Sequence, residues 1–94
     1  MNFRFEQANK AAAKLISNGQ HVFSPISHTH PISQVQELPT NWGYWKAYDE
    51  EMLSKCSKLI VLTLNGWMES VGVNAEIEFA TQNGIEIEYM EPVE

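Results

Sequence analysis

The sequence has 94 residues and a single cysteine, Cys56. One cysteine cannot form a disulfide within its own chain, so the composition fits a reducing compartment. Because Cys56 lies in an apolar setting between Leu53 and Leu59, we expect a buried structural thiol rather than a nucleophile. The expected location of the protein is therefore the cytoplasm.

Positive charge is also scarce. Six Lys and Arg residues stand against twelve Asp and Glu residues, which gives a formal net charge of −6. The basic residues are scattered singly, so the counterion release that drives binding to nucleic acid backbones is missing, and we expect no nucleic acid polymer as a partner. A small anionic substrate is not excluded, because N–H groups at the start of a helix hold an anion without a basic side chain.

Long apolar runs are absent. No run approaches ~18 residues, the length that a membrane-spanning helix needs, and residues 1–11 lack the apolar core of a secretory signal. We therefore expect no membrane as a partner. The apolar share of 44% is typical of a globular protein, and the length fits one small domain over residues 1–94.

Helices and strands alternate in the predicted order of elements. This order indicates a parallel sheet with right-handed crossovers, and therefore an α/β fold with about three strands and three helices. A chain of this kind normally begins with a strand, whereas this one begins with a helix, so partner chains would be needed to cover a thin sheet. The expected helices are Phe3–Ser17, Thr40 or Asn41 to Cys56, and Ser70–Asn83; the expected strands are His21–Ser24, Lys58–Leu64 and Ile85–Met90; residues 24–39 form a long connection with one helical turn around residues 33–37.

Two carboxylates interrupt apolar helix faces. Asp49 lies four residues after Trp45 and four before Leu53, and Glu76 lies three residues after Val73. Two such side chains on helices that flank one strand would converge at one crevice, where partial burial raises at least one pKa and suits an acid beside an ionised partner. The alternative for each is a carboxylate at the border of the core, held by a backbone N–H or a lysine.

The connection from the predicted strand at residues 58–64 to the helix at residues 70–83 favours ligand binding. It places backbone N–H groups and a positive helix end at the carboxyl edge of the sheet, where ligands of open α/β sheets bind. Ser70 and Gly72 stand at the start of that helix, one to two turns before Glu76.

Two histidines, His28 and His30, would share one side of an extended segment. Loop-structuring hydrogen bonds, contact with a substrate and metal ligation are the three interpretations; because no third ligand is evident, we expect neither a metal nor another cofactor. Trp45 belongs to an aromatic cluster over residues 42–48, for which core packing and stacking on a base or sugar face both stay open.

The segment SVGVNAEI at residues 70–77 resembles the Ser-x-Gly-x-x-x-Glu-Leu/Ile segment of the nucleoside 2-deoxyribosyltransferase superfamily, which includes the 2′-deoxynucleoside 5′-monophosphate N-glycosidases. FSPISHTHP at residues 23–31, together with residues 42–49 and 62–70, resembles a small bacterial and phage branch of that group. The resemblance covers nearly the whole chain. It implies a flavodoxin-like (Rossmann-like) three-layer fold and cleavage or transfer at the N-glycosidic bond of a nucleoside or its 5′-monophosphate.

The resemblance also assigns roles. Glu76 would be the nucleophile, Asp49 would help to protonate the leaving base, and Ser70 beside Gly72 would contact the sugar or phosphate, as in a retaining glycosidase. Family members begin with a strand and commonly form dimers or larger oligomers, so the resemblance implies a shortened domain that self-associates. A module that binds a nucleotide-derived ligand without turnover, and an inactive truncated form, are the alternatives.

Overall fold

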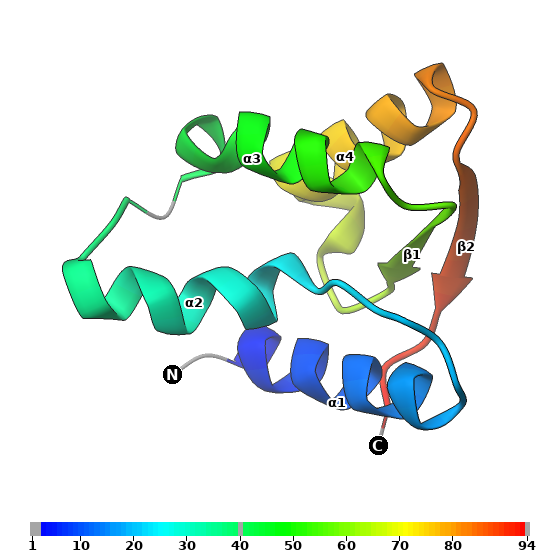
Figure 1. The fold of residues 1–94 in the computed structure, drawn as a ribbon, viewed down its shortest axis with the longest axis horizontal. Helices are drawn as coiled ribbons and strands as arrows, with labels where there is room; N and C mark the ends of the chain where they lie inside the picture. The colour runs from blue at the N-terminus through cyan, green and yellow to red at the C-terminus, as the bar shows by residue number, and fades with distance from the viewer. Residues whose placement is uncertain (1–2, 40, 94) are drawn as a thin grey trace. The chain divides into compact units, whose positions relative to one another are not determined.

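The computed structural model describes residues 3–39 and 41–93. Within these residues the chain has an α/β composition of four α-helices, one short 3-10 helix and two strands (Figure 1). It divides into two compact units, Met1–Pro39 with Pro92–Glu94 and Thr40–Glu91. The elements are α1 (Phe3–Ser17), α2 (Pro25–Gln36), α3 (Trp42–Ser54), β1 (Lys58–Leu62), η1 (Trp67–Glu69), α4 (Val71–Gln82) and β2 (Glu86–Met90).

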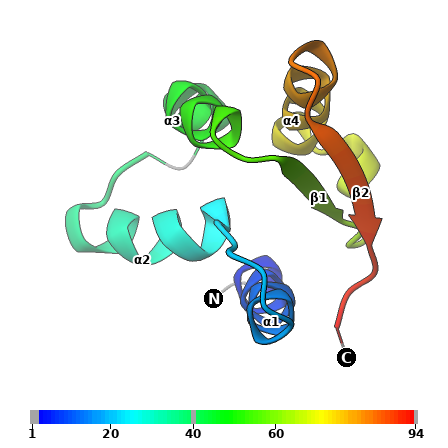
Figure 2. The same ribbon diagram turned by 45° about the vertical axis from the view of Figure 1, so that its right-hand side comes forward.

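The first unit is built from α1 and α2, which pack against each other (Figure 2). The helix predicted over Phe3–Ser17 is confirmed. It ends because Gly19 adopts a φ of 93°, a left-handed conformation that glycine takes without strain, and the N–H of Gly19 donates to the carbonyl of Ile16 at 2.9 Å. Ala11 of α1 is buried, 7% exposed.

The prediction for residues 21–39 is wrong in two places. Residues 20–24 form neither helix nor strand, so the expected strand His21–Ser24 is missing, and the expected long connection contains the twelve-residue helix α2. Pro25 begins this helix rather than ending a strand, because the first helical position needs no N–H donor. The Ser24 carbonyl accepts the His28 N–H at 2.9 Å and closes the first turn.

Helix α2 continues through Pro31, which lacks the N–H that would bond the preceding turn. Hydroxyl side chains before and after Pro31 donate to backbone carbonyls that precede it: Thr29 donates to Pro25 at 2.8 Å, and Ser33 donates to His30 at 2.9 Å. The helix ends where Glu37 takes the left-handed conformation, with φ at 54°.

The second unit contains the remaining elements. Asn41 caps α3, since its Oδ1 atom accepts the Tyr44 N–H at 2.8 Å, and the predicted helix is confirmed. Strands β1 and β2 pair in parallel, with Lys58 opposite Glu86 and Leu62 opposite Met90. The sheet therefore has two strands among the described residues, where the sequence predicted three.

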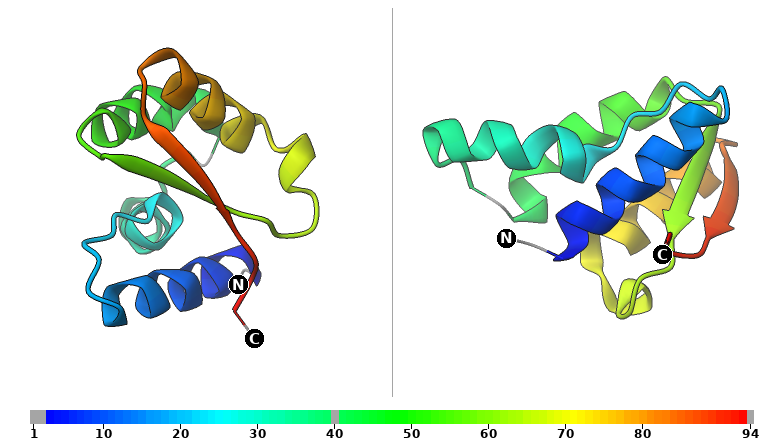
Figure 3. Two further views of the ribbon diagram at one scale, coloured as in Figure 1. Left: turned by 90° about the vertical axis from the view of Figure 1, so that its right-hand side faces the viewer. Right: turned by 90° about the horizontal axis from the view of Figure 1, so that it is seen from below.

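Helices α3 and α4 pack against each other and lie on the same side of the two strands (Figure 3). The core of this unit contains Leu53 from α3, Val61 from β1 and Ala80 from α4, of which Ala80 is completely buried. Cys56 follows α3, is half-buried, and donates its thiol proton to the Met52 carbonyl at 3.4 Å. The thiol thus lies at the border of the core, whereas the sequence analysis expected it to be buried.

Candidate functional site

The packing of α3 on α4 brings two carboxylates together. Asp49 lies in the middle of α3 and is 8% exposed. Glu76 lies in the second turn of α4 and is partly buried. The apolar neighbours that complete each helix face drive both faces inward, and the carboxylates follow because they occupy positions on those faces.

The electrostatics of the pair follow from this burial. Loss of hydration raises the pKa of Glu76 from its ordinary value of 4.5 to about 7, and the negative charge of nearby Asp49 adds to the rise. Near neutral pH Glu76 is therefore about half protonated, whereas an exposed glutamate is ionised. Such a pair offers a proton donor and a negatively charged oxygen side by side, which is the chemistry of general acid catalysis beside a nucleophile.

The raised pKa belongs to Glu76, the residue that the family resemblance makes the nucleophile. A nucleophile must be ionised, so this assignment needs the shared proton to reside on Asp49 when substrate is bound. The reverse assignment, with Glu76 as the acid, requires the opposite dependence on pH. The pH profile of an activity would separate the two assignments.

Ser70 and Gly72 hold the start of α4 in place. The Ser70 hydroxyl oxygen accepts the Val73 N–H at 3.2 Å and caps the helix. Gly72 faces the Trp42 indole so closely that a methyl group built on Gly72 would lie 3.4 Å from Cε3 of the ring. Sequence reasoning missed this contact between α3 and α4, and its one visible signal is an aromatic residue placed directly after the Asn41 cap.

The histidines do not lie on one side of an extended segment. His28 and His30 are in α2, where residues two positions apart point in widely different directions. His28 lies against Phe23, with ring centroids 5.3 Å apart, and His30 lies against Phe5 at 4.5 Å. Over residues 3–39 and 41–93, no three His, Cys, Asp or Glu side chains are grouped so that they would hold a metal ion.

Trp45 forms an aromatic row along α3 with its neighbours. Its ring meets Tyr44 at 5.3 Å and Tyr48 at 5.5 Å, both edge to face. Trp45 is half-buried, whereas Tyr44 and Tyr48 are 52% and 41% exposed. Both ring contacts lie within α3, and the choice between core packing and stacking on a ligand stays a prediction for Trp45.

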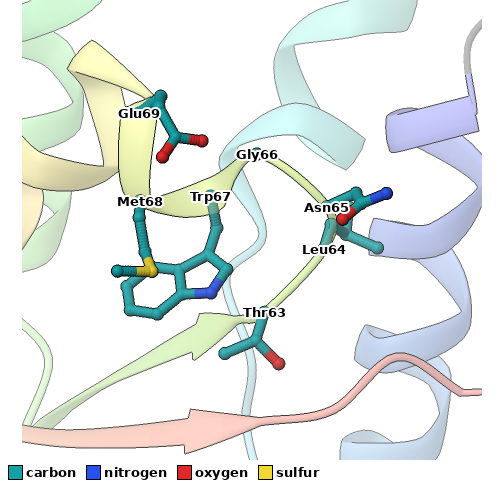
Figure 4. Close-up of a pocket in the computed structure, with 7 residues that line it drawn as sticks. All are labelled: Thr63, Leu64, Asn65, Gly66, Trp67, Met68 and Glu69. Atoms are coloured by element: carbon teal, nitrogen blue, oxygen red, sulfur yellow. The ribbon is translucent and has the colours of Figure 1, made fainter.

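A hollow of about 290 Å³ lies in the loop between β1 and α4, the connection at which the sequence analysis expects ligand binding. Its lining is the continuous segment Thr63–Glu69 (Figure 4). The Thr63 hydroxyl donates to the Met90 carbonyl at 3.1 Å, and the Trp67 and Tyr89 rings lie 5.5 Å apart. The loop is thus fastened to β2 at both of these points.

The part of the chain described here contains no helix with the length and apolarity to cross a membrane. A comparison with curated proteins finds none that matches the chain. A protein-family model described as a domain of unknown function, DUF1937, matches residues 1–92. Since the match spans almost the full sequence, the chain belongs to the DUF1937 family.

Proposed function

We propose that the protein cleaves the N-glycosidic bond of a nucleoside or its 5′-monophosphate, by hydrolysis or by transfer to another base, through Glu76 and Asp49. The observation that carries this proposal is the coupled carboxyl pair between α3 and α4, in which burial and the charge of Asp49 raise the pKa of Glu76 to about 7. The resemblance of residues 70–77 to the nucleoside 2-deoxyribosyltransferase superfamily supports it independently.

The reaction would proceed in two steps. The ionised Glu76 carboxylate attacks the anomeric carbon while the bond from that carbon to the base nitrogen breaks, and the bonding electrons pass to the base. Asp49 gives its proton to the leaving base, a contribution of about 10²–10⁴-fold in rate. Water or a second base then attacks the glycosyl ester and frees Glu76.

The proposal extends to the fold. The β1–α4–β2 segment, with its parallel pairing and its covering helix, is the repeating unit of a flavodoxin-like sheet, and β1 and β2 would be two adjacent strands of it. In such a sheet the loop after β1 lies at the carboxyl edge, where substrates bind.

Release of free base tests the proposal. The full chain is incubated with each 2′-deoxynucleoside and each 5′-monophosphate, and the base is quantified by chromatography. We expect Glu76→Gln to lower kcat/KM by at least about a thousandfold, because the attacking oxygen is lost. Glu78→Gln, an equal change at an exposed position of the same helix, should stay within about twofold.

Full activity in Glu76→Gln, or no base release from any substrate, would contradict the proposal. Saturable binding without base release would favour instead the module that holds a nucleotide-derived ligand without turnover.

A further inference from the structure

The hollow in the β1–α4 loop is braced before any ligand arrives. The loop has two hydrogen bonds in addition to its two attachments to β2. The Asn74 side-chain amide donates to the Met68 carbonyl at 2.9 Å, and the backbone N–H of Trp67 donates to the Leu64 carbonyl at 2.9 Å. Gly66 makes the turn at a φ of 85°, which other residues adopt only with strain. A braced loop loses little conformational entropy on binding, which favours affinity for a small ligand.

The lining of the hollow suits a hydroxylated ring. Trp67 presents a broad apolar face with one N–H donor, and Asn65 offers an amide that both donates and accepts (Figure 4). The Thr63 hydroxyl gives its proton to Met90, so its oxygen is left to accept. The Glu69 carboxylate accepts hydrogen bonds from hydroxyl groups. The volume of about 290 Å³ is small for a ligand pocket and fits a part of a nucleoside, such as its sugar.

The same lining disfavours phosphate. Among the described residues around the hollow, Glu69 alone carries charge, and that charge is negative. Glu69 directly precedes the capping residue of α4, so its negative charge opposes the attraction of that helix end for an anion. The Ser70 hydroxyl oxygen is engaged as well, since it accepts the Val73 N–H. A 5′-phosphate placed here would meet repulsion from the Glu69 carboxylate.

We infer that this hollow binds the uncharged sugar of a nucleoside and thereby selects nucleosides over their 5′-monophosphates. The inference rests on the proposed function and narrows its substrate class. Glu76 stands five residues after Val71, the first residue of α4, which is about 7.5 Å along the helix axis. Glu76 therefore lies in the first half of the helix that directly follows the loop.

Calorimetry with the full chain carrying Glu76→Gln tests the inference, because binding is then measured without turnover. The probes are the four 2′-deoxynucleosides and their 5′-monophosphates. We expect each favoured nucleoside to bind at least about tenfold more tightly than its monophosphate, as charge repulsion at close range predicts. Adding Glu69→Gln should bring the ratio close to one by improving the binding of the monophosphate. Glu78→Gln, the matched change outside the hollow, should leave the ratio unchanged.

A second measurement uses no further variant. Raising the salt concentration should narrow the difference between nucleoside and monophosphate, because salt screens the repulsion by Glu69. Three outcomes would overturn the inference. The monophosphates bind as tightly as the nucleosides or more tightly, the ratio of the two affinities is unchanged by Glu69→Gln, or neither ligand binds.

The two proposals fail in different ways. Base release that needs Glu76 and prefers monophosphates would overturn the inference and leave the proposed function standing. Binding that selects nucleosides through Glu69, without base release from the unaltered protein, would support the inference and contradict the proposed function.

Discussion

Glu76 links the stability of the fold to pH. Its pKa is about 7 in the folded protein and near the ordinary 4.5 when the chain unfolds, so the folded state binds the proton more tightly. The stabilisation from this proton is fully present below about pH 4.5 and is lost as the pH rises to about 7. The shift corresponds to about 3 kcal/mol.

Urea unfolding at pH 5 and pH 8 measures this link. The free energy of unfolding should be lower at pH 8, by up to about 3 kcal/mol, because Glu76 must then ionise in a partly dry site. Glu76→Gln should remove most of this difference, whereas Glu78→Gln should retain it. The same slope in all three proteins would mean that other groups carry the pH dependence.

The pH dependence of kcat/KM assigns the roles within the pair. With Glu76 as the nucleophile, the rate should rise as the pH increases through about 7, since only the ionised form attacks. A rate that only falls through this range would identify Glu76 as the acid.

Sequence reasoning identified Asp49 and Glu76 because each breaks an apolar helix face, and an inward face is visible in the spacing alone. It missed the contact of Trp42 with Gly72, because this contact depends on how α3 and α4 meet. The sequence analysis placed His28 and His30 in an extended segment, where the two side chains would share one side. They lie in helix α2 instead, so they point in different directions.

At the scale of elements, caps and periodicity located α1, α3, α4 and both strands. Helix α2 was not predicted, because residues 24–39, which contain Pro25 and Pro31, were expected to form a long connection. Pro25 in fact occupies the first turn, where proline is favoured, and the turns around Pro31 carry hydroxyl-to-carbonyl bonds from Thr29 and Ser33. Local helix propensity did not indicate helix α2, because this helix forms where it packs against α1.

Two helix caps give a matched pair of variants. Asn41 caps α3 and Ser70 caps α4, each through one side-chain oxygen. Asn41→Ala and Ser70→Ala should each lower the free energy of unfolding by about 1 kcal/mol. If Ser70 also positions the sugar, Ser70→Ala should raise KM several-fold more than Asn41→Ala does. Equal effects of the two substitutions on KM would mean that Ser70 acts only as a helix cap.

At the scale of the whole molecule, burial is shallow. Among the described residues no large side chain is completely buried, while Phe3, Val35 and Val71 are 63%, 83% and 71% exposed. Chains of this length bury a modest share of their surface even when compact. Association with a second copy would cover apolar surface that a single chain leaves in water.

We therefore expect the protein to self-associate. Light scattering coupled to size-exclusion chromatography should give a mass of at least two chains. The urea midpoint should rise with protein concentration, because association stabilises the folded form by mass action. A mass of one chain, with a midpoint independent of concentration, would contradict this expectation.

The attachment of the β1–α4 loop to β2 has a practical consequence. Thr63 donates both its backbone N–H and its hydroxyl to the single carbonyl of Met90, the last residue of β2. Tension or bulk introduced immediately after Met90 would be transmitted to the hollow through two hydrogen bonds. A fluorescent label or a surface-immobilisation anchor placed there would therefore report on ligand capture, and would also disturb it.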